Sequence, residues 1–217
     1  MNADSDYYKH HRPEVANLLP ETYRRVLEVG CGEGVFRSNL SKPCEYTGVE
    51  PSPTAATTAR KTLDRVLTGT YDTVATDLPL DYFDLVICND VIEHMIDHDK
   101  FLEDVKRHMK PGATIVGSVP NVRYFFHLWD LLVGKDWKYV DHGILDRTHL
   151  RFFTQKSWRT SLNAHGFSIE VLQGLNQPAW GERLLRRWAK LTLASLVGAD
   201  SKFIQIGFRA KLNATTG

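Results

Sequence analysis

The sequence has few cysteines, no excess of either charge and no long apolar run. Its three cysteines, Cys31, Cys44 and Cys88, are too few and too scattered for a disulfide framework or a metal cluster, which fits a reducing compartment. The 27 basic and 26 acidic residues nearly cancel, which argues against nucleic acid as a partner. No segment is apolar for long enough to span a bilayer, and residues 1–9 have no signal-peptide pattern. We therefore expect a cytoplasmic protein.

What the sequence does contain is an alternation of short apolar runs with helical patterns. Runs typical of buried strands lie at residues 26–29, 46–49, 65–67, 83–88, 114–119, 168–172 and 203–208. Helices are expected over residues 35–40, 52–63, 99–109, 125–133, 155–165 and 182–196. This order predicts an α/β fold, with a Rossmann-like, mainly parallel sheet that has helices on both faces. Without a repeat or a linker, residues 1–217 should form a single domain.

A glycine-rich turn follows the first expected strand. It reads Glu28-Val29-Gly30-Cys31-Gly32-Glu33-Gly34, and its glycines let the backbone turn sharply and let a ligand lie directly on it. The spacing differs from the dinucleotide-binding pattern, and the lysine of a P-loop is missing. An acidic residue at the start of the run suits a ligand with an ammonium group. A plain structural turn is the alternative interpretation.

A second acidic residue stands at the end of the second expected strand. Glu50 lies 20 residues after Gly30, where a carboxylate can accept hydrogen bonds from both hydroxyls of an unphosphorylated ribose. Alone, Glu50 would be interpreted as a solvated side chain. Together with the glycine turn it predicts an adenosyl ligand.

Three segments resemble the class I S-adenosylmethionine-dependent methyltransferases. Residues 26–34 resemble motif I of that superfamily, and residues 83–94 and 110–121 resemble its fourth-strand and fifth-strand regions. The resemblance implies S-adenosyl-L-methionine as the cofactor and a seven-stranded sheet whose last strand is antiparallel. It also implies that Glu28 and the glycines cradle the methionyl group and that Glu50 holds the ribose. Asn89, followed by Asp90, would approach the amine and the methyl group.

The adenine contact and the amino terminus are less determined by the resemblance. The acidic residue often found after the third strand is replaced by Gly69-Thr70, so that Thr70, Asp72 or Asp77 would meet the adenine. Residues 1–20 are expected to cover the cofactor, with Tyr8 and Arg12 at its methionyl end, or else to form a loose terminus.

Residues 121–153 interrupt the alternation and are rich in aromatic residues and histidine, which predicts an inserted helical and aromatic cap around the methyl acceptor. A hydroxyl acceptor needs a base, for which His149 is the preferred candidate and His94 and His142 are alternatives, although each can equally be structural. Candidates for binding the acceptor are Arg123, Tyr124, Arg147 and Arg151; Arg147 and Arg151 could instead pair with Asp141 and Asp146. No compact ligand spacing indicates a metal.

Residues 120–123 and 146–153 are similar to bacterial methyltransferases associated with glycan and secondary-metabolite pathways, which suggests a small hydroxylated acceptor such as a sugar. The leading prediction is therefore a small-molecule O-methyltransferase. One alternative is N- or C-methyl transfer, which is weakened because no Pro-Pro-Tyr follows Asn89. The other is a non-catalytic partner subunit that binds the cofactor, and the intact glycine turn argues against it.

An extra segment at residues 178–198 contains an amphipathic helix that favours a cap or homodimer contact over a lipid surface.

Overall fold

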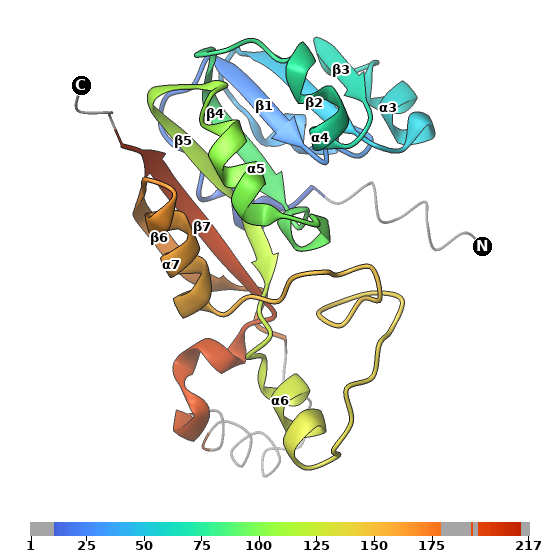
Figure 1. Cartoon of the computed structure of the whole chain (residues 1–217), viewed down its shortest axis with the longest axis vertical. Helices are drawn as coiled ribbons and strands as arrows, with labels where there is room; N and C mark the ends of the chain where they lie inside the picture. Colours follow the sequence, from blue (N-terminus) through green and yellow to red (C-terminus); the bar gives the residue numbers. More distant parts are fainter. Residues whose placement is uncertain (1–10, 179–191, 193–194, 214–217) are drawn as a thin grey trace.

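The central sheet of the protein has seven strands in the order β3-β2-β1-β4-β5-β7-β6 (Figure 1). The computed structural model describes residues 11–178, 192 and 195–213. The strands are β1 (Arg25–Val29), β2 (Glu45–Glu50), β3 (Arg65–Thr68), β4 (Phe83–Asn89), β5 (Met109–Pro120), β6 (Phe167–Leu175) and β7 (Gln205–Leu212). β7 runs antiparallel to both β5 and β6, whereas the pairs among β1 to β5 are parallel. The Rossmann-like α/β fold and its antiparallel last strand are confirmed.

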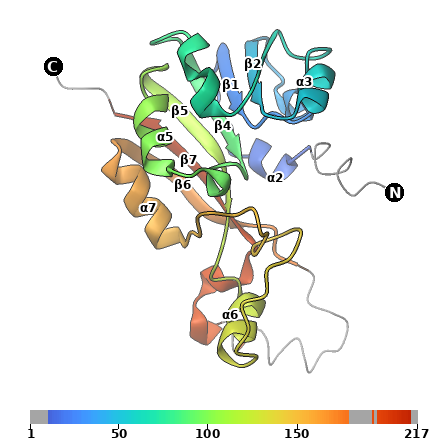
Figure 2. The ribbon, with the colours of Figure 1, turned by 45° about the vertical axis from the view of Figure 1, so that its right-hand side comes forward.

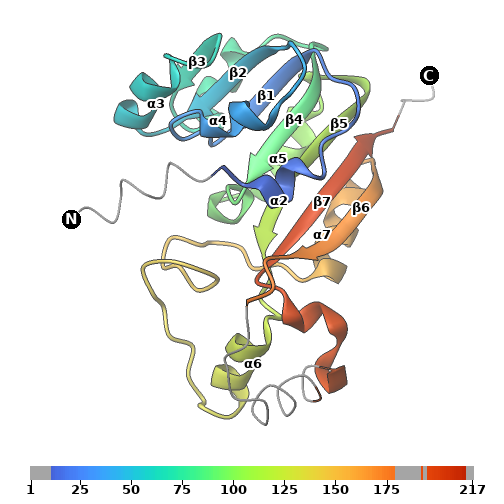
Figure 3. The same ribbon diagram turned by 180° about the vertical axis from the view of Figure 1, so that it is seen from behind.

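Helices cover both faces of the sheet, as predicted. The α-helices are α2 (Pro13–Ala16), α3 (Pro53–Ala59), α4 (Tyr71–Val74), α5 (His98–Val105), α6 (Phe125–Leu132) and α7 (Gln155–Ala164). Short 3₁₀ helices form η1 (Val35–Asn39), η2 (Ala75–Asp77), η3 (Ile92–His94) and η4 (Ala199–Lys202). One apolar core lies under α4, α5 and α7, and a second one lies under α2, η1 and α3. In Figure 1 α5 and α7 lie in front of the sheet, and in Figure 3 α2 does.

The start of α3 follows from its sequence, but its end does not. The Ser52 hydroxyl accepts a hydrogen bond from the backbone amide of Ala55 at 3.3 Å, and proline occupies the first helical position, as expected. The helix ends at Ala59, earlier than predicted, because the amides of Lys61 and Thr62 donate to carbonyls three residues back, which tightens the chain into turns before β3 begins at Arg65. The residues between them form the turn that returns the chain to the edge of β2.

The cap lies beyond the carboxyl end of β5, where α6 and the following loop form a lobe below the sheet (Figures 1 and 2). The backbone amides of Leu150 and Arg151 donate hydrogen bonds to the Glu93 carbonyl at 2.8 and 3.0 Å, so the end of this loop is fixed to η3. Most of the expected helix at residues 182–196, with its cap or dimer role, lies outside the described residues. Within the described residues, no helix is both long enough and apolar enough to cross a membrane.

Candidate active site

The glycine turn forms the floor of a cleft at the carboxyl ends of β1, β2 and β4. Gly30, Gly32 and Gly34 have φ values of 75°, 54° and 80°, a region that side chains with a Cβ rarely adopt. A Cβ on Gly30 would lie 2.9 Å from a Val91 methyl group. Gly34 is not among the cleft residues; a Cβ there would lie 2.9 Å from the Thr62 hydroxyl, so this glycine serves close packing against the segment after α3.

The cleft has a volume of about 340 Å³, a size typical of small-molecule sites. The predicted cofactor residues that line it are Glu28, Gly30, Cys31, Gly32, Glu50, Asn89, Asp90 and Arg12. They come from the amino terminus and from the ends of three strands, and the fold brings them together at one edge of the sheet. Tyr8 lies outside the described residues.

Glu50 connects β2 to the glycine turn. One of its carboxylate oxygens accepts a hydrogen bond from the Gly32 amide and the other accepts one from the Ser52 amide, each at 2.8 Å. Burial raises the pKa of Glu50, and these two backbone donors oppose the rise. Because each oxygen of a carboxylate accepts more than one hydrogen bond, both can still receive a hydroxyl from a ligand.

Glu28 lies deeper, on β1. It is 3% exposed, and it accepts a hydrogen bond from the Tyr46 hydroxyl at 2.8 Å. Burial raises the pKa of Glu28 from its ordinary value of 4.5 to about 8, although the Tyr46 hydrogen bond opposes the rise. Tyr46 was not singled out from the sequence, because a tyrosine inside a strand has no local feature that distinguishes it from core.

A second hollow of about 240 Å³ adjoins the cleft and also contains Gly30, Pro51, Val91 and His94. Its remaining walls are largely apolar, and Gly69, Thr70, Tyr71 and Asp72 line it. Two of the three candidates for the adenine contact, Thr70 and Asp72, thus line one hollow beside the cleft. Asp77 is not among these residues, and its carbonyl accepts a hydrogen bond from Arg65 at 3.0 Å.

A third cavity, of about 410 Å³, also adjoins the cleft and shares Arg12, Asp90 and His94 with it. Its other polar lining residues are Glu93, His142, Asp146, His149, Asn176 and Gln205. The predicted bases therefore lie in one cavity that meets the cofactor cleft. Asn176 and Gln205 were not predicted; a polar residue between Ile204 and Ile206 in a buried strand was the available signal for Gln205.

Asp90 forms the junction between the cleft and this third cavity. It has a positive φ of 48°, and one of its carboxylate oxygens accepts a hydrogen bond from the Ser118 hydroxyl at 2.8 Å. Its other oxygen is contacted by the Arg12 guanidinium and by the Gln205 side-chain amide. The amino terminus, β4, β5 and β7 thus meet on a single carboxylate.

His94 and His149 form a pair in this third cavity, with their ring centroids 4.7 Å apart and the rings nearly perpendicular. The His94 Nδ1 lies 3.3 Å from the Thr148 carbonyl, and the His149 Nδ1 lies 3.0 Å from the Ile144 carbonyl. Burial, and secondly His149, lowers the pKa of His94. His94 also lines the cofactor cleft, whereas His149 lines the third cavity and is not among the cleft residues.

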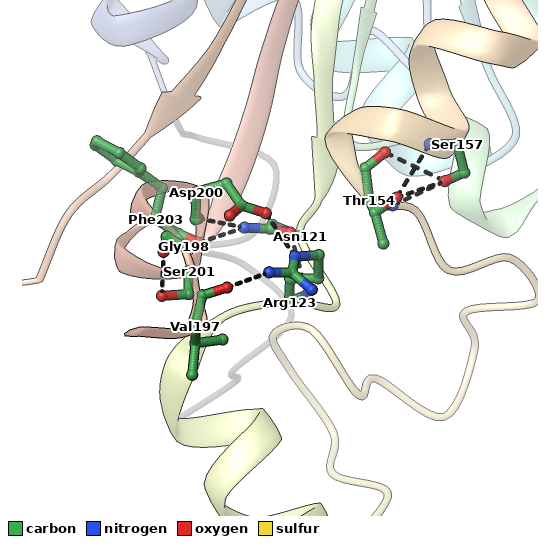
Figure 4. A network of polar contacts seen from close by, with 9 residues as sticks. All are labelled: Asn121, Arg123, Thr154, Ser157, Val197, Gly198, Asp200, Ser201 and Phe203. Atoms are coloured by element: carbon green, nitrogen blue, oxygen red, sulfur yellow. Dashed lines mark hydrogen bonds and ion pairs between the residues drawn. The ribbon is translucent and has the colours of Figure 1, made fainter. Parts of the chain in front are cut away.

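The four predicted acceptor-binding residues lie outside this cavity. Arg123 instead joins the end of β5 to η4, because its guanidinium donates to Asp200 and to the Val197 carbonyl, each at 2.6 Å (Figure 4). The remaining three make local contacts: Tyr124 with the Phe126 ring, Arg147 with Asp141 at 2.8 Å, and Arg151 with the carbonyls of Leu150 and Ile96. For Arg147 the structure thus shows the Asp141 ion pair that was the alternative.

The chain belongs to the methyltransferase-domain family, which matches residues 5–172. It is an S-adenosylmethionine-dependent methyltransferase, and S-adenosyl-L-methionine is its cofactor. A ubiquinone biosynthesis O-methyltransferase from Azorhizobium caulinodans is 27% identical over 177 residues, 77% of this chain and 68% of that protein. The human mitochondrial ubiquinone biosynthesis O-methyltransferase is 24% identical over 209 residues, 88% of this chain and 56% of that protein. A methyltransferase structure from Archaeoglobus fulgidus matches with a TM-score of 0.67 at 18% identity, over 97% of this chain and 100% of that one.

Proposed function

We propose that the enzyme transfers the methyl group of S-adenosyl-L-methionine to a hydroxyl oxygen of a small acceptor bound in the 410 Å³ cavity. The observation that carries this proposal is the junction at Arg12, Asp90 and His94, where the cofactor cleft and this cavity share their walls. Methyl transfer is an in-line displacement, so it requires an acceptor site that opens directly onto the methyl group.

The acceptor cavity is small, and its lining supports a hydroxylated ring as the substrate. Apolar contacts come from Pro120, Ile144 and Ile204, and hydrogen-bonding groups come from Asn176 and Gln205. This mixture suits a phenol or a sugar, in which a compact ring carries several hydroxyls. Oxygen as the accepting atom is supported by the relatives whose names state O-methyl transfer.

Within the cofactor site, we assign roles from the cleft and the hollow of about 240 Å³ that adjoins it. The glycine turn would hold the methionyl group, Glu50 the ribose hydroxyls, and the hollow beside Thr70 and Asp72 the adenine. The side-chain amide of Asn89 is buried, and neither of its polar atoms has a hydrogen-bond partner within the described part of the chain. A buried amide without a partner is costly, so we assign it to the bound methionyl group.

The experiment that tests this function uses the full chain and a panel of phenols, sugars and amines with radiolabelled cofactor. We expect S-adenosylhomocysteine to raise the melting temperature, because a ligand that binds only the folded state stabilises it. We also expect label in a hydroxylated acceptor. Transfer to amines alone would overturn the O-methylation proposal.

A further inference from the structure

We propose that Glu93, His94 and His149 bind a divalent transition-metal cation in the acceptor cavity. The chemical role of this cation rests on the function proposed above, whereas its binding does not. The sequence indicated no metal because the third ligand, His149, lies far along the chain from Glu93 and His94; the contact between η3 and the cap loop brings it beside them.

The first argument is the state of the Glu93 carboxylate. Its side chain is fully buried, and within residues 11–178, 192 and 195–213 neither of its oxygens has a hydrogen-bond partner. Removing a carboxylate from water without a donor or a cation is strongly unfavourable. Glu93, His94 and His149 each offer one ligand atom, and these atoms all lie within 4.8 Å of one another. A cation among them would compensate the buried carboxylate.

The second argument is the direction of the two imidazole rings. A carbonyl oxygen only accepts hydrogen bonds, so the Nδ1 atoms of His94 and His149, which face the carbonyls of Thr148 and Ile144, must carry the protons. In neutral histidines this leaves the Nε2 lone pairs free. The His149 Nε2 then faces an oxygen of Glu93 at 4.0 Å, too far apart for a hydrogen bond between them. Metal-binding histidines in proteins are held in this way, with the second nitrogen donating to a backbone carbonyl.

Neighbouring side chains support these ligands and do not add to them. The Thr148 hydroxyl donates to Asp146 at 2.6 Å, so its oxygen is free to accept from the His94 Nδ1 at 3.2 Å. Asp90 is already engaged by Arg12, Ser118 and Gln205, and it is therefore not a ligand.

One carboxylate and two imidazoles favour Zn²⁺, Mn²⁺, Fe²⁺ or Co²⁺ over Ca²⁺ or Mg²⁺, which prefer oxygen ligands. Three protein ligands would leave coordination positions open for an acceptor hydroxyl, and all three ligand residues line the acceptor cavity. An acceptor hydroxyl bound there loses its proton to water. Its oxygen forms a bond with the methyl carbon as the sulfur–methyl bond breaks, and the electron pair of that bond returns to sulfur to give S-adenosylhomocysteine.

The test uses the tag-free full chain, stripped with a chelator and dialysed against Zn²⁺, Mn²⁺ or Co²⁺, with bound metal measured by mass spectrometry and the visible absorption of Co²⁺ recorded. We expect about one equivalent of metal per chain. Glu93→Gln and His149→Ala should each weaken metal binding at least tenfold, since each removes a ligand. The matched control is His142→Ala, which removes an exposed histidine of the same cavity and should leave metal binding unchanged.

S-adenosylhomocysteine binding to each variant separates the possible outcomes. Metal lost in Glu93→Gln and His149→Ala, with cofactor binding retained, supports the site and shows that these variants are folded. Metal retained in both variants, or no metal bound by the wild type, overturns the site while leaving the methyltransferase function intact. If the wild type binds metal but does not bind S-adenosylhomocysteine, the result contradicts the function proposed above and leaves the metal site standing.

Discussion

The Glu50 carboxylate holds the Gly32 amide at 2.8 Å, so the residue assigned to the ribose also fixes the backbone on which the methionyl group would rest. Two parts of the cofactor site, on β2 and after β1, are thereby mechanically connected. A change at Glu50 should therefore affect more of the ligand than the ribose alone.

Glu50→Gln is expected to weaken S-adenosylhomocysteine binding at least tenfold, measured by calorimetry. The substitution places an amide nitrogen against a backbone donor and removes a charged acceptor, and the loss of one such bond is worth about 1.5–3 kcal/mol. The matched control is Glu33→Gln, in the same turn but outside the cleft residues. Unchanged affinity in Glu50→Gln would contradict the assignment.

Gly30→Ala is expected to lower the free energy of unfolding and to abolish cofactor binding. The positive φ costs about 1–2 kcal/mol, and the new Cβ would meet Val91 at 2.9 Å. Gly166→Ala is the matched control for the backbone cost, because Gly166 has a similar φ of 78° and nothing within 4 Å of the added atom. In urea unfolding, Gly30→Ala should cost more than Gly166→Ala, and adding Val91→Ala should recover part of the difference. Equal costs would show that the steric argument is wrong.

Cofactor binding is expected to tighten as pH rises toward 8 and to release a proton. In the free protein burial raises the pKa of Glu28 to about 8, so its carboxyl holds a proton near neutrality. A ligand ammonium group favours the charged carboxylate and lowers that pKa. Calorimetry in two buffers with different ionisation enthalpies measures the proton release, and Glu28→Gln should reduce it. If Glu28→Gln releases as many protons as the wild type, the source lies elsewhere.

The Glu28 carboxyl also makes the stability of the free protein depend on pH. Its folded-state pKa lies above its ordinary value of 4.5, so the folded chain binds the proton more tightly than the unfolded chain. Its contribution is fully present below 4.5 and is lost as pH rises through about 8. Urea unfolding from pH 5 to 8 should therefore show a steeper decline in the wild type than in Glu28→Gln, and parallel curves would contradict the raised pKa.

Arg123→Ala is expected to destabilise the fold by about 1–3 kcal/mol, the cost of losing charge-assisted hydrogen bonds, while leaving S-adenosylhomocysteine affinity unchanged. The reason is that Arg123 connects β5 to Asp200 and Val197 and does not line the acceptor cavity. Arg147→Ala, which removes an exposed ion pair, should change stability by less than about 0.5 kcal/mol. Equal effects of the two substitutions on chemical denaturation would refute this structural role.

The parts of the site that could be predicted from sequence are those fixed by local geometry. The glycine turn and Glu50 follow their strands directly, and the carboxyl ends of parallel strands meet at one edge of a sheet. Arg123 carries no local signal that it pairs with Asp200, which lies far along the chain. The same holds for the proximity of Glu93 to His149 and for Gln205 at Asp90, which depend on how the cap loop and β7 return to the sheet. Contacts of this kind are decided by tertiary packing, and short-range sequence patterns carry little information about it.

The position of β7 between β5 and β6 has a consequence during synthesis. β6 reaches the sheet only through β7, and β7 begins at Gln205. While the ribosome has not yet released that segment, the emerged chain can pair β1 to β5 but has no partner for β6. The nascent polypeptide therefore has an unpaired edge on β5 until β7 is made, and this interval is when it most needs protection from aggregation.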